Sequence, residues 1–333
     1  MASEGLSRRR FLGMLGASAL AVSGACRSST RPAAGTVTTT TTTAAGISPS
    51  SSSTSTTVGP ATTTVPPAAA TTATTSHPVT AGFVAFGDAG GGPAQGAVAE
   101  AMHRWAQARR VDALVTTGDN VYDFGEPRFF AAQLDDPYRR LRDGGRPLWA
   151  TLGNHDVVNG HGPAQLAHLG LPALPYARQL PGVRILFLDS GAAVTPQARW
   201  LDAELARPGP PAVVVFHAPI RSCGLHGPFR PLVEQWTPII EGHRVPLVLN
   251  GHDHLYNRFV SPAGTTYVVT GGGGRPLYAH RAGCGGAGLA ASAVRHHFVG
   301  VEVSGTRMTL TAVTPDGVVI DQAEIPFGVA APA

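Results

Sequence analysis

The stretch Ala113-Leu114-Val115-Thr116-Thr117-Gly118-Asp119-Asn120-Val121-Tyr122 contains the pattern that decides the fold of this chain. Its apolar run predicts a short buried strand, and Gly118 predicts the turn that ends it. The same pattern occurs on both sides, where residues 81–86 lead into Asp88 and residues 147–151 lead into Asn154. Helices are predicted between these strands, over residues 94–110 and 127–142. The alternation of strand and helix predicts an α/β fold with polar residues at the strand exits.

The second half of the chain continues the alternation and ends in strands. Strands are predicted over residues 184–188, 212–216 and 246–249, with helices over 196–206 and 231–241. The C-terminal part shows strand patterns joined by glycine-containing turns, over residues 267–270, 298–303, 308–313 and 318–325. We therefore expect two β-sheets packed face to face, with helices outside.

Five turns carry residue types that bind metal ions: Gly87-Asp88-Ala89-Gly90, Gly118-Asp119-Asn120-Val121-Tyr122, Gly153-Asn154-His155-Asp156, Phe216-His217-Ala218-Pro219 and Gly251-His252-Asp253-His254. Each turn is a weak signal alone, because Gly-Asp after a strand is most often a turn or a helix cap. Together they offer hard oxygen and imidazole donors, mostly just after predicted strands. Such a set indicates a site for two metal ions, of the kind that drives in-line displacement at phosphorus.

In their order, these segments resemble the motifs of the calcineurin-like metallophosphoesterases and, within them, the purple acid phosphatases. The resemblance covers about residues 80–275. The general superfamily carries Asp-x-His and Gly-Asp-x-x-Asp, whereas Gly90 here replaces the histidine and Tyr122 replaces the second aspartate. Both departures are typical of the purple acid phosphatase branch. The resemblance implies an α/β metallophosphoesterase-type four-layer sandwich of two mixed β-sheets, with helices outside.

The resemblance also implies two sets of metal ligands that share Asp119 as a bridge. One ion would be held by Asp88, Asp119, Tyr122 and His254, and the other by Asp119, Asn154, His217 and His252. Carboxylates and a phenolate suit Fe(III), and an amide with two imidazoles suits a divalent ion, which could be Fe, Zn or Mn. Asp253 is expected to point away from the ions. Residues 271–274 lack the Lys-Ser/Thr of a nucleotide-binding loop, and we expect a tight passage beside the metals.

Two further histidines, His155 and His226, are the candidates for catalysis. The resemblance implies that they bind phosphate or protonate the leaving group. The remaining histidines lack a ligand-type neighbourhood and are interpreted as surface or loop residues: His103, His161, His168, His243, His280, His296 and His297. The expected activity is hydrolysis of phosphate monoesters at acidic to neutral pH. The alternatives are a phosphodiesterase or nucleotidase on the same scaffold, and a non-catalytic surface-binding lipoprotein with a vestigial site.

The N-terminal part has the features of an export signal followed by a tether. Ser7-Arg8-Arg9-Arg10-Phe11-Leu12 places a twin arginine before an apolar stretch that is too short to span a bilayer comfortably. Small residues before Cys26 indicate a lipoprotein-type signal over residues 1–26, with cleavage and secretion as the alternative. Residues 27–78 are rich in Ser, Thr, Ala and Pro and predict a disordered tether. Residues 79–333 then form the catalytic domain, outside the cytoplasm.

Charge and cysteine content restrict the expected partners. The net charge of +4 comes entirely from the N-terminal part, where five arginines, Arg8, Arg9, Arg10, Arg27 and Arg31, face only Glu4. The catalytic domain is therefore neutral and lacks the basic surface that nucleic-acid binding requires. We expect a monomer that takes small phosphate esters and that attaches to a membrane only through an N-terminal lipid. If Cys26 carries the lipid, Cys223 and Cys284 form either a disulfide or two free buried thiols.

Overall fold

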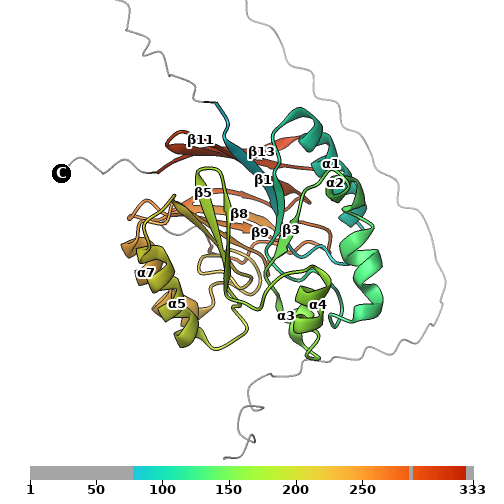
Figure 1. The fold of residues 1–333 in the computed structure, drawn as a ribbon, viewed down its shortest axis with the longest axis horizontal. Helices are drawn as coiled ribbons and strands as arrows, with labels where there is room; N and C mark the ends of the chain where they lie inside the picture. The colour runs from blue at the N-terminus through green and yellow to red at the C-terminus, as the bar shows by residue number, and fades with distance from the viewer. Residues whose placement is uncertain (1–77, 285–287, 328–333) are drawn as a thin grey trace, which may run out of the picture. The chain divides into compact units, whose positions relative to one another are not determined.

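The computed structural model describes residues 78–284 and 288–327, and these form two mixed β-sheets with helices on their outer faces (Figure 1). The first sheet has six strands in the spatial order β13 (Val319–Pro326), β12 (Arg307–Val313), β11 (Phe298–Ser304), β1 (Ala81–Phe86), β2 (Ala113–Thr116) and β3 (Leu148–Ala150). Strands β1, β2 and β3 are parallel, and β11 pairs antiparallel with β1.

The second sheet has seven strands in the order β10 (Leu289–Ala293), β8 (Tyr256–Val260), β9 (Thr266–Thr270), β7 (Leu247–Asn250), β6 (Ala212–Val215), β5 (Val183–Phe187) and β4 (Tyr176–Leu180). Its centre is parallel, because β5 pairs with β6, β6 with β7, and β7 with β9 in the same direction. The antiparallel strands β4, β8 and β10 complete the sheet.

The core between the sheets follows from the alternation of side chains along each strand. On β1, Phe83 and Ala85 join a buried cluster with Ile185, Val213 and other residues of the second sheet. The alternate side chain Val84 lies in a different cluster, on the helix-covered face. Both faces of β1 are therefore buried, which explains why its sequence is apolar at almost every position.

Helices cover the outer faces of both sheets. On the first sheet these are α1 (Gln95–Ala108) and α2 (Arg139–Arg142), and on the second α5 (Val194–Ala206), α6 (Arg230–Gln235) and α7 (Thr237–Gly242) (Figure 1). The short helices α3 (Asn154–Val157) and α4 (Gly162–His168) follow β3. The expected four-layer α/β sandwich is confirmed.

Two predicted helices are wrong in detail. Residues 127–142 form a 3₁₀ turn (Pro127–Phe129), a π-helical turn (Ala131–Asp135) and the short α2 instead of one helix. The side chain of Gln133 explains part of the irregularity, because it accepts from the Tyr122 N–H at 2.8 Å and donates to the Tyr122 carbonyl at 3.1 Å. The helix predicted over 231–241 divides into α6 and α7, since Pro238 has no N–H to continue the hydrogen-bond ladder.

The expectations for the N-terminal part lie outside the described residues. These are the signal over residues 1–26 and the tether over 27–78, of which only residue 78 is described. Across residues 78–284 and 288–327, no helix combines the length and apolarity needed to cross a bilayer.

Candidate metal centre

The five ligand-bearing turns meet at one place between the two sheets. Parallel strands β1, β2 and β3 end at the same edge of the first sheet, and β6 and β7 end together in the second. Backbone hydrogen bonds join the turns: Asp88 N donates to the Gly118 carbonyl, and Gly251 N to the His217 carbonyl, each at 3.0 Å. The carboxylate of Asp88 accepts from His252 N, also at 3.0 Å, which links the two sheets at this point.

The first predicted ligand set lies within a few ångströms. The Tyr122 hydroxyl donates to Asp119 Oδ2 at 2.8 Å and lies 3.3 Å from His254 Nε2. His254 Nε2 in turn lies 3.5 Å from Asp88 Oδ1. These four residues form one continuous group of potential metal ligands.

The second set is equally compact and shares Asp119 with the first. His217 Nε2 lies 3.4 Å from Asp119 Oδ2, 3.1 Å from Asn154 Oδ1 and 3.2 Å from His252 Nδ1. Ligand atoms of Asp88, Asp119 and His217 all lie within 4.8 Å of one another. The structure thus brings all seven predicted ligands together, with Asp119 Oδ2 in contact with both groups.

Backbone strain coincides with the predicted ligands. Among the described residues, four non-glycine residues have positive φ, and three of them are Asp88 at 56°, Asp119 at 53° and His252 at 72°. This left-handed conformation is disfavoured for side chains other than glycine and concentrates at functional sites. It directs each side chain inward from a tight turn.

Backbone carbonyls determine which imidazole nitrogens face the centre. His217 Nδ1 lies 2.9 Å from the Thr117 carbonyl, and His254 Nδ1 lies 2.8 Å from the Pro276 carbonyl. A carbonyl can only accept, so each Nδ1 carries a proton, and Nε2 is the nitrogen of each ring that faces the centre. A backbone acceptor on the second ring nitrogen is the usual support of a metal-binding histidine.

The buried charges are unbalanced without a cation. Asp88 is fully buried, and burial raises the pKa of its carboxyl group. Burial also raises the pKa of the Tyr122 phenol well above its usual value, and the two carboxylates add to this effect. No Arg or Lys is ion-paired to Asp88 or Asp119 among the described residues.

The pKa values of His217 and His252 shift in opposite directions. Burial alone would lower the pKa of His217, but the carboxylates of Asp119 and Asp88 outweigh it and raise the value to about 10. Burial and the neighbouring His217 lower the pKa of His252 to about 2. A proton on His217 Nε2 can be donated to His252 Nδ1, which lies 3.2 Å away, and a metal ion bound by both nitrogens would replace that proton. The donor set therefore fits two cations.

The two candidate catalytic histidines flank the centre on either side. The ring of His155 lies 4.1 Å from that of Tyr122, and the ring of His226 lies 4.2 Å from that of His252. His155 Nδ1 lies 2.8 Å from the Asp123 carbonyl and donates to it, which leaves Nε2 free to exchange a proton. His155 is half-buried, and His226 is exposed, so solutes can reach both rings.

Asp156 organises the turns that carry three of the ligands. Its carboxylate accepts from the N–H groups of Asn120, Val121 and Gly153 and from the side chains of Asn120 and Gln165, at 2.8 to 3.2 Å. It caps the turn at α3 and also fixes the neighbouring turn between Asp119 and Tyr122.

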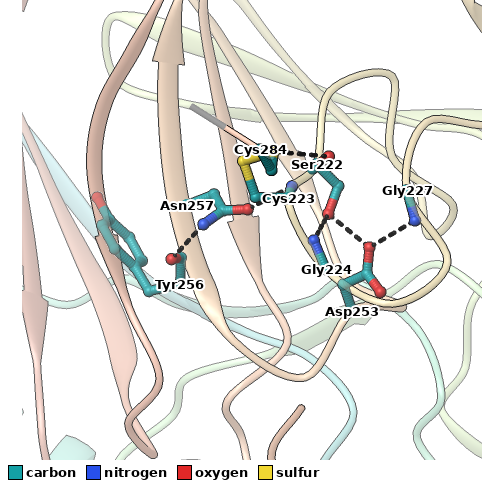
Figure 2. The surroundings of a disulfide bond; sticks show 8 residues. All are labelled: Ser222, Cys223, Gly224, Gly227, Asp253, Tyr256, Asn257 and Cys284. Carbon is teal, nitrogen blue, oxygen red and sulfur yellow. Dashed lines mark hydrogen bonds between the residues drawn. A yellow bond between two sulfur atoms is a disulfide. The ribbon is translucent and has the colours of Figure 1, made fainter. Parts of the chain in front are cut away.

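Asp253 points away from the predicted ligands, as expected, but it has a role that the sequence did not reveal. Its buried carboxylate accepts from the Ser222 hydroxyl and from Gly227 N at 3.2 Å (Figure 2). It also accepts from His226 N at 2.9 Å. The turn between the predicted ligands His252 and His254 thus holds the loop that carries His226. No sequence motif indicates this contact, because the acceptor and its donors are distant in the chain.

A disulfide joins Cys223 to Cys284, with a Cα separation of 5.3 Å (Figure 2). It links the His226 loop to the segment that precedes β10. The Cys223 carbonyl accepts from Arg281 N, and Cys223 N donates to Asn257 Oδ1, both at 2.8 Å. Of the two states that the sequence left open for these cysteines, the structure contains the bonded one.

Residues 271–281 form one side of the centre and contain features that the sequence analysis missed. Tyr278 stacks on the ligand candidate His254 at 4.1 Å, and the guanidinium of Arg275 lies 4.2 Å from the Tyr122 ring. The expected tight passage is present, since a Cβ on Gly271 would overlap the Asp253 carbonyl and crowd Asp88. Tyr278 and Arg275 follow a glycine run without a strand pattern, so no sequence signal placed them here.

The comparisons with known proteins agree with this site. The model of the calcineurin-like phosphoesterase family matches residues 82–256. Purple acid phosphatase 7 of Arabidopsis thaliana is 28% identical over 240 residues, which cover 60% of this chain and 71% of that protein. Tartrate-resistant acid phosphatase type 5 of Rattus norvegicus is 30% identical over 246 residues, which cover 60% and 74%.

A solved structure shows the same fold. The purple acid phosphatase from yellow lupin (Lupinus luteus) seeds superposes with a TM-score of 0.63 at 18% identity, over 74% of this chain and 54% of that chain. With the family match and the relatives above, the chain belongs to the calcineurin-like phosphoesterase family, in the purple acid phosphatase-like branch. It is a phosphatase, and membership of the family implies a dinuclear metal centre.

Proposed function

We propose that this chain hydrolyses phosphate monoesters as an acid phosphatase, with Fe(III) held by Asp88, Asp119, Tyr122 and His254 and a divalent ion held by Asp119, Asn154, His217 and His252. The observation that carries the proposal is the convergence of the seven side chains, with Asp119 Oδ2 close to Tyr122 of the first proposed group and to His217 of the second. The relatives named as acid phosphatases support the activity.

The chain's own residues bind and orient the phosphate ester and protonate its leaving group. When bound, the two ions would neutralise the phosphoryl oxygens and make a nucleophile available at mild pH. The carbonyls of Thr117 and Pro276 hold His217 and His254 in the tautomers that ligation requires. His155 and His226 stand on opposite sides of the centre, where each can bind the phosphoryl group or protonate the leaving oxygen.

The proposal also includes export of the protein from the cytoplasm. We place the active domain at residues 79–333, outside the cytoplasm, as a monomer that is either anchored through Cys26 or secreted. The Cys223–Cys284 disulfide supports this location, because disulfides persist in oxidising compartments.

Metal analysis together with a visible spectrum tests the metal assignment. Phenolate bound to Fe(III) absorbs visible light, so the purified protein should be coloured and contain iron. Tyr122→Phe should bleach it. A colourless protein that holds only Zn or Mn would contradict the Fe(III) assignment.

Kinetics test the substrate class. Hydrolysis of phenyl phosphate should exceed that of a bis-aryl phosphate, with a rate that is highest at acidic to neutral pH. A preference for the diester would favour a phosphodiesterase on this scaffold. A metal-loaded protein without activity on either ester would favour a binding role.

A further inference from the structure

A second cavity lies away from the metal centre, over the helices of the second sheet. It has a volume of about 440 Å³ and is lined by the segment after β6, helices α6 and α7, strand β8 and the residues just before Cys284. None of the seven predicted ligands and neither candidate catalytic histidine lines it. Its volume is that of a site for a small organic ligand, on the order of 300 to 1,000 Å³.

Two buried polar atoms at this cavity have no partner in the described part of the chain. They are Arg221 Nε and Thr237 Oγ1, and both residues line the cavity. Leaving such a group unsatisfied costs about 1–3 kcal/mol, and native proteins contain few of them. Both can donate a hydrogen bond, so a negative charge in the cavity would stabilise these two groups electrostatically.

The charge around the cavity is positive. Arg221 has a distant partner in Glu241, at 3.6 Å, and its guanidinium lies 5.3 Å from the Tyr267 ring. Arg281 also lines the cavity, and no carboxylate lies within ion-pair distance of it among residues 78–284 and 288–327. One glutamate therefore faces two guanidinium groups.

The rest of the wall is apolar. Ile220 and Phe259 are buried there, and Val233 on α6 is 36% exposed at the cavity. An inorganic anion would leave this apolar surface without contacts. The complementary ligand has an acceptor-rich anionic group and an apolar body.

We infer that this cavity binds a small organic anion, in which a carboxylate or sulfonate group is attached to an aromatic or aliphatic body. The anionic group pairs with the guanidinium groups of Arg221 and Arg281, and the unpartnered Arg221 Nε and Thr237 Oγ1 lie buried in the wall behind them. The body packs on Ile220, Phe259 and the segment beside the disulfide. This binding goes beyond phosphate-ester hydrolysis and does not depend on the metal centre.

Fluorescence titration of the full chain with 8-anilinonaphthalene-1-sulfonate tests the inference. One saturable site is expected. The uncharged analogue N-phenyl-1-naphthylamine has the same rings without the sulfonate and should bind at least about tenfold more weakly, a difference of about 1.4 kcal/mol. Excess inorganic phosphate should leave the sulfonate bound. Displacement by phosphate, or equal affinity for both probes, would overturn the inference.

Surface variants locate the site. Val233→Glu places a like charge beside the anion and should weaken sulfonate binding about tenfold or more, whereas the matched Val233→Gln should change it less than about threefold. Arg281→Gln should weaken binding about tenfold as well. Near-ultraviolet circular dichroism checks that each variant is folded, since the probe also binds loosened cores. Unchanged affinity in folded Val233→Glu and Arg281→Gln would refute the site.

Discussion

The contact between Asp253 and the His226 loop leads to a quantitative prediction for Asp253→Asn. One carboxylate oxygen accepts from the Ser222 hydroxyl and Gly227 N, and the other accepts from His226 N. Asparagine keeps one acceptor oxygen but turns an NH₂ group toward at least one N–H donor. A hydrogen bond to a charged group contributes about 1.5–3 kcal/mol, so this is the expected loss in the free energy that holds the turn.

That loss predicts the kinetic effect. The disulfide still restrains Cys223, so the turn from Gly224 to Gly227 is the part that loosens. At 1.4 kcal/mol for each tenfold change, the equilibrium constant for holding His226 in place falls about 10- to 100-fold. We expect kcat for phenyl phosphate to fall by up to the same factor. The loss should be smaller for 4-nitrophenyl phosphate, because its leaving group needs less protonation.

The assay compares Asp253→Asn, His226→Ala and the double variant, with Asp143→Asn as a surface control. Metal content is measured by mass spectrometry and should equal that of the unmodified protein. If Asp253 acts through His226, the double variant should be within about twofold of His226→Ala alone. Additive losses, or full activity of Asp253→Asn with both esters, would refute the positioning role.

Three further changes test the fold and the centre. Burial lowers the pKa of His297 from 6.5 to about 4, so the unfolded chain takes up a proton first as the pH falls. The free energy of unfolding should drop by about 3 kcal/mol between pH 6.5 and pH 4, and His297→Gln should remove that part of the slope in urea titrations. The Cys223–Cys284 bond closes a loop of 61 residues, so Cys223→Ser with Cys284→Ser should cost about 4 kcal/mol of unfolding free energy. A Cβ on Gly153 would overlap Asp119, so Gly153→Ala should weaken metal binding about 10- to 100-fold. Gly96→Ala, on open helix surface, is its control.

Each of these has a clear contrary result. An identical pH slope in His297→Gln would show that other groups cause the acid sensitivity. A reductant that leaves the urea midpoint unchanged would show that the disulfide does not restrain the unfolded chain. Full metal content in Gly153→Ala would show that Asp119 can move without losing the ion.

The ligand turns were predictable because their signal is local. A short apolar run, a glycine and a ligand-type residue recur in order, and parallel strands bring such exits to a common edge. The strained backbone of Asp88, Asp119 and His252 could not be predicted, because a left-handed residue other than glycine leaves no sequence pattern.

The errors came from tertiary contacts and from weak patterns. Strand β4 is only partly buried, and β10 consists largely of small residues, so neither segment has a sequence pattern that predicts a strand. Strand β8 begins two residues after His254 and was hidden by the ligand turn. His297 was interpreted as a surface or loop residue but is fully buried, with Nε2 3.1 Å from Thr270 Oγ1 and Nδ1 2.9 Å from the Arg295 carbonyl. Its partner Thr270 lies 27 residues away in the chain, so sequence neighbours could not reveal the burial.

The pairing of β1 with β11 has a consequence for protein synthesis. Ala81 is among the first residues of the described domain to leave the ribosome, yet its partner Val303 is translated near the end. Until then, one edge of β1 has unsatisfied N–H and C=O groups that can recruit another nascent chain. Ribosome-bound intermediates halted before Phe298 should therefore depend on chaperones.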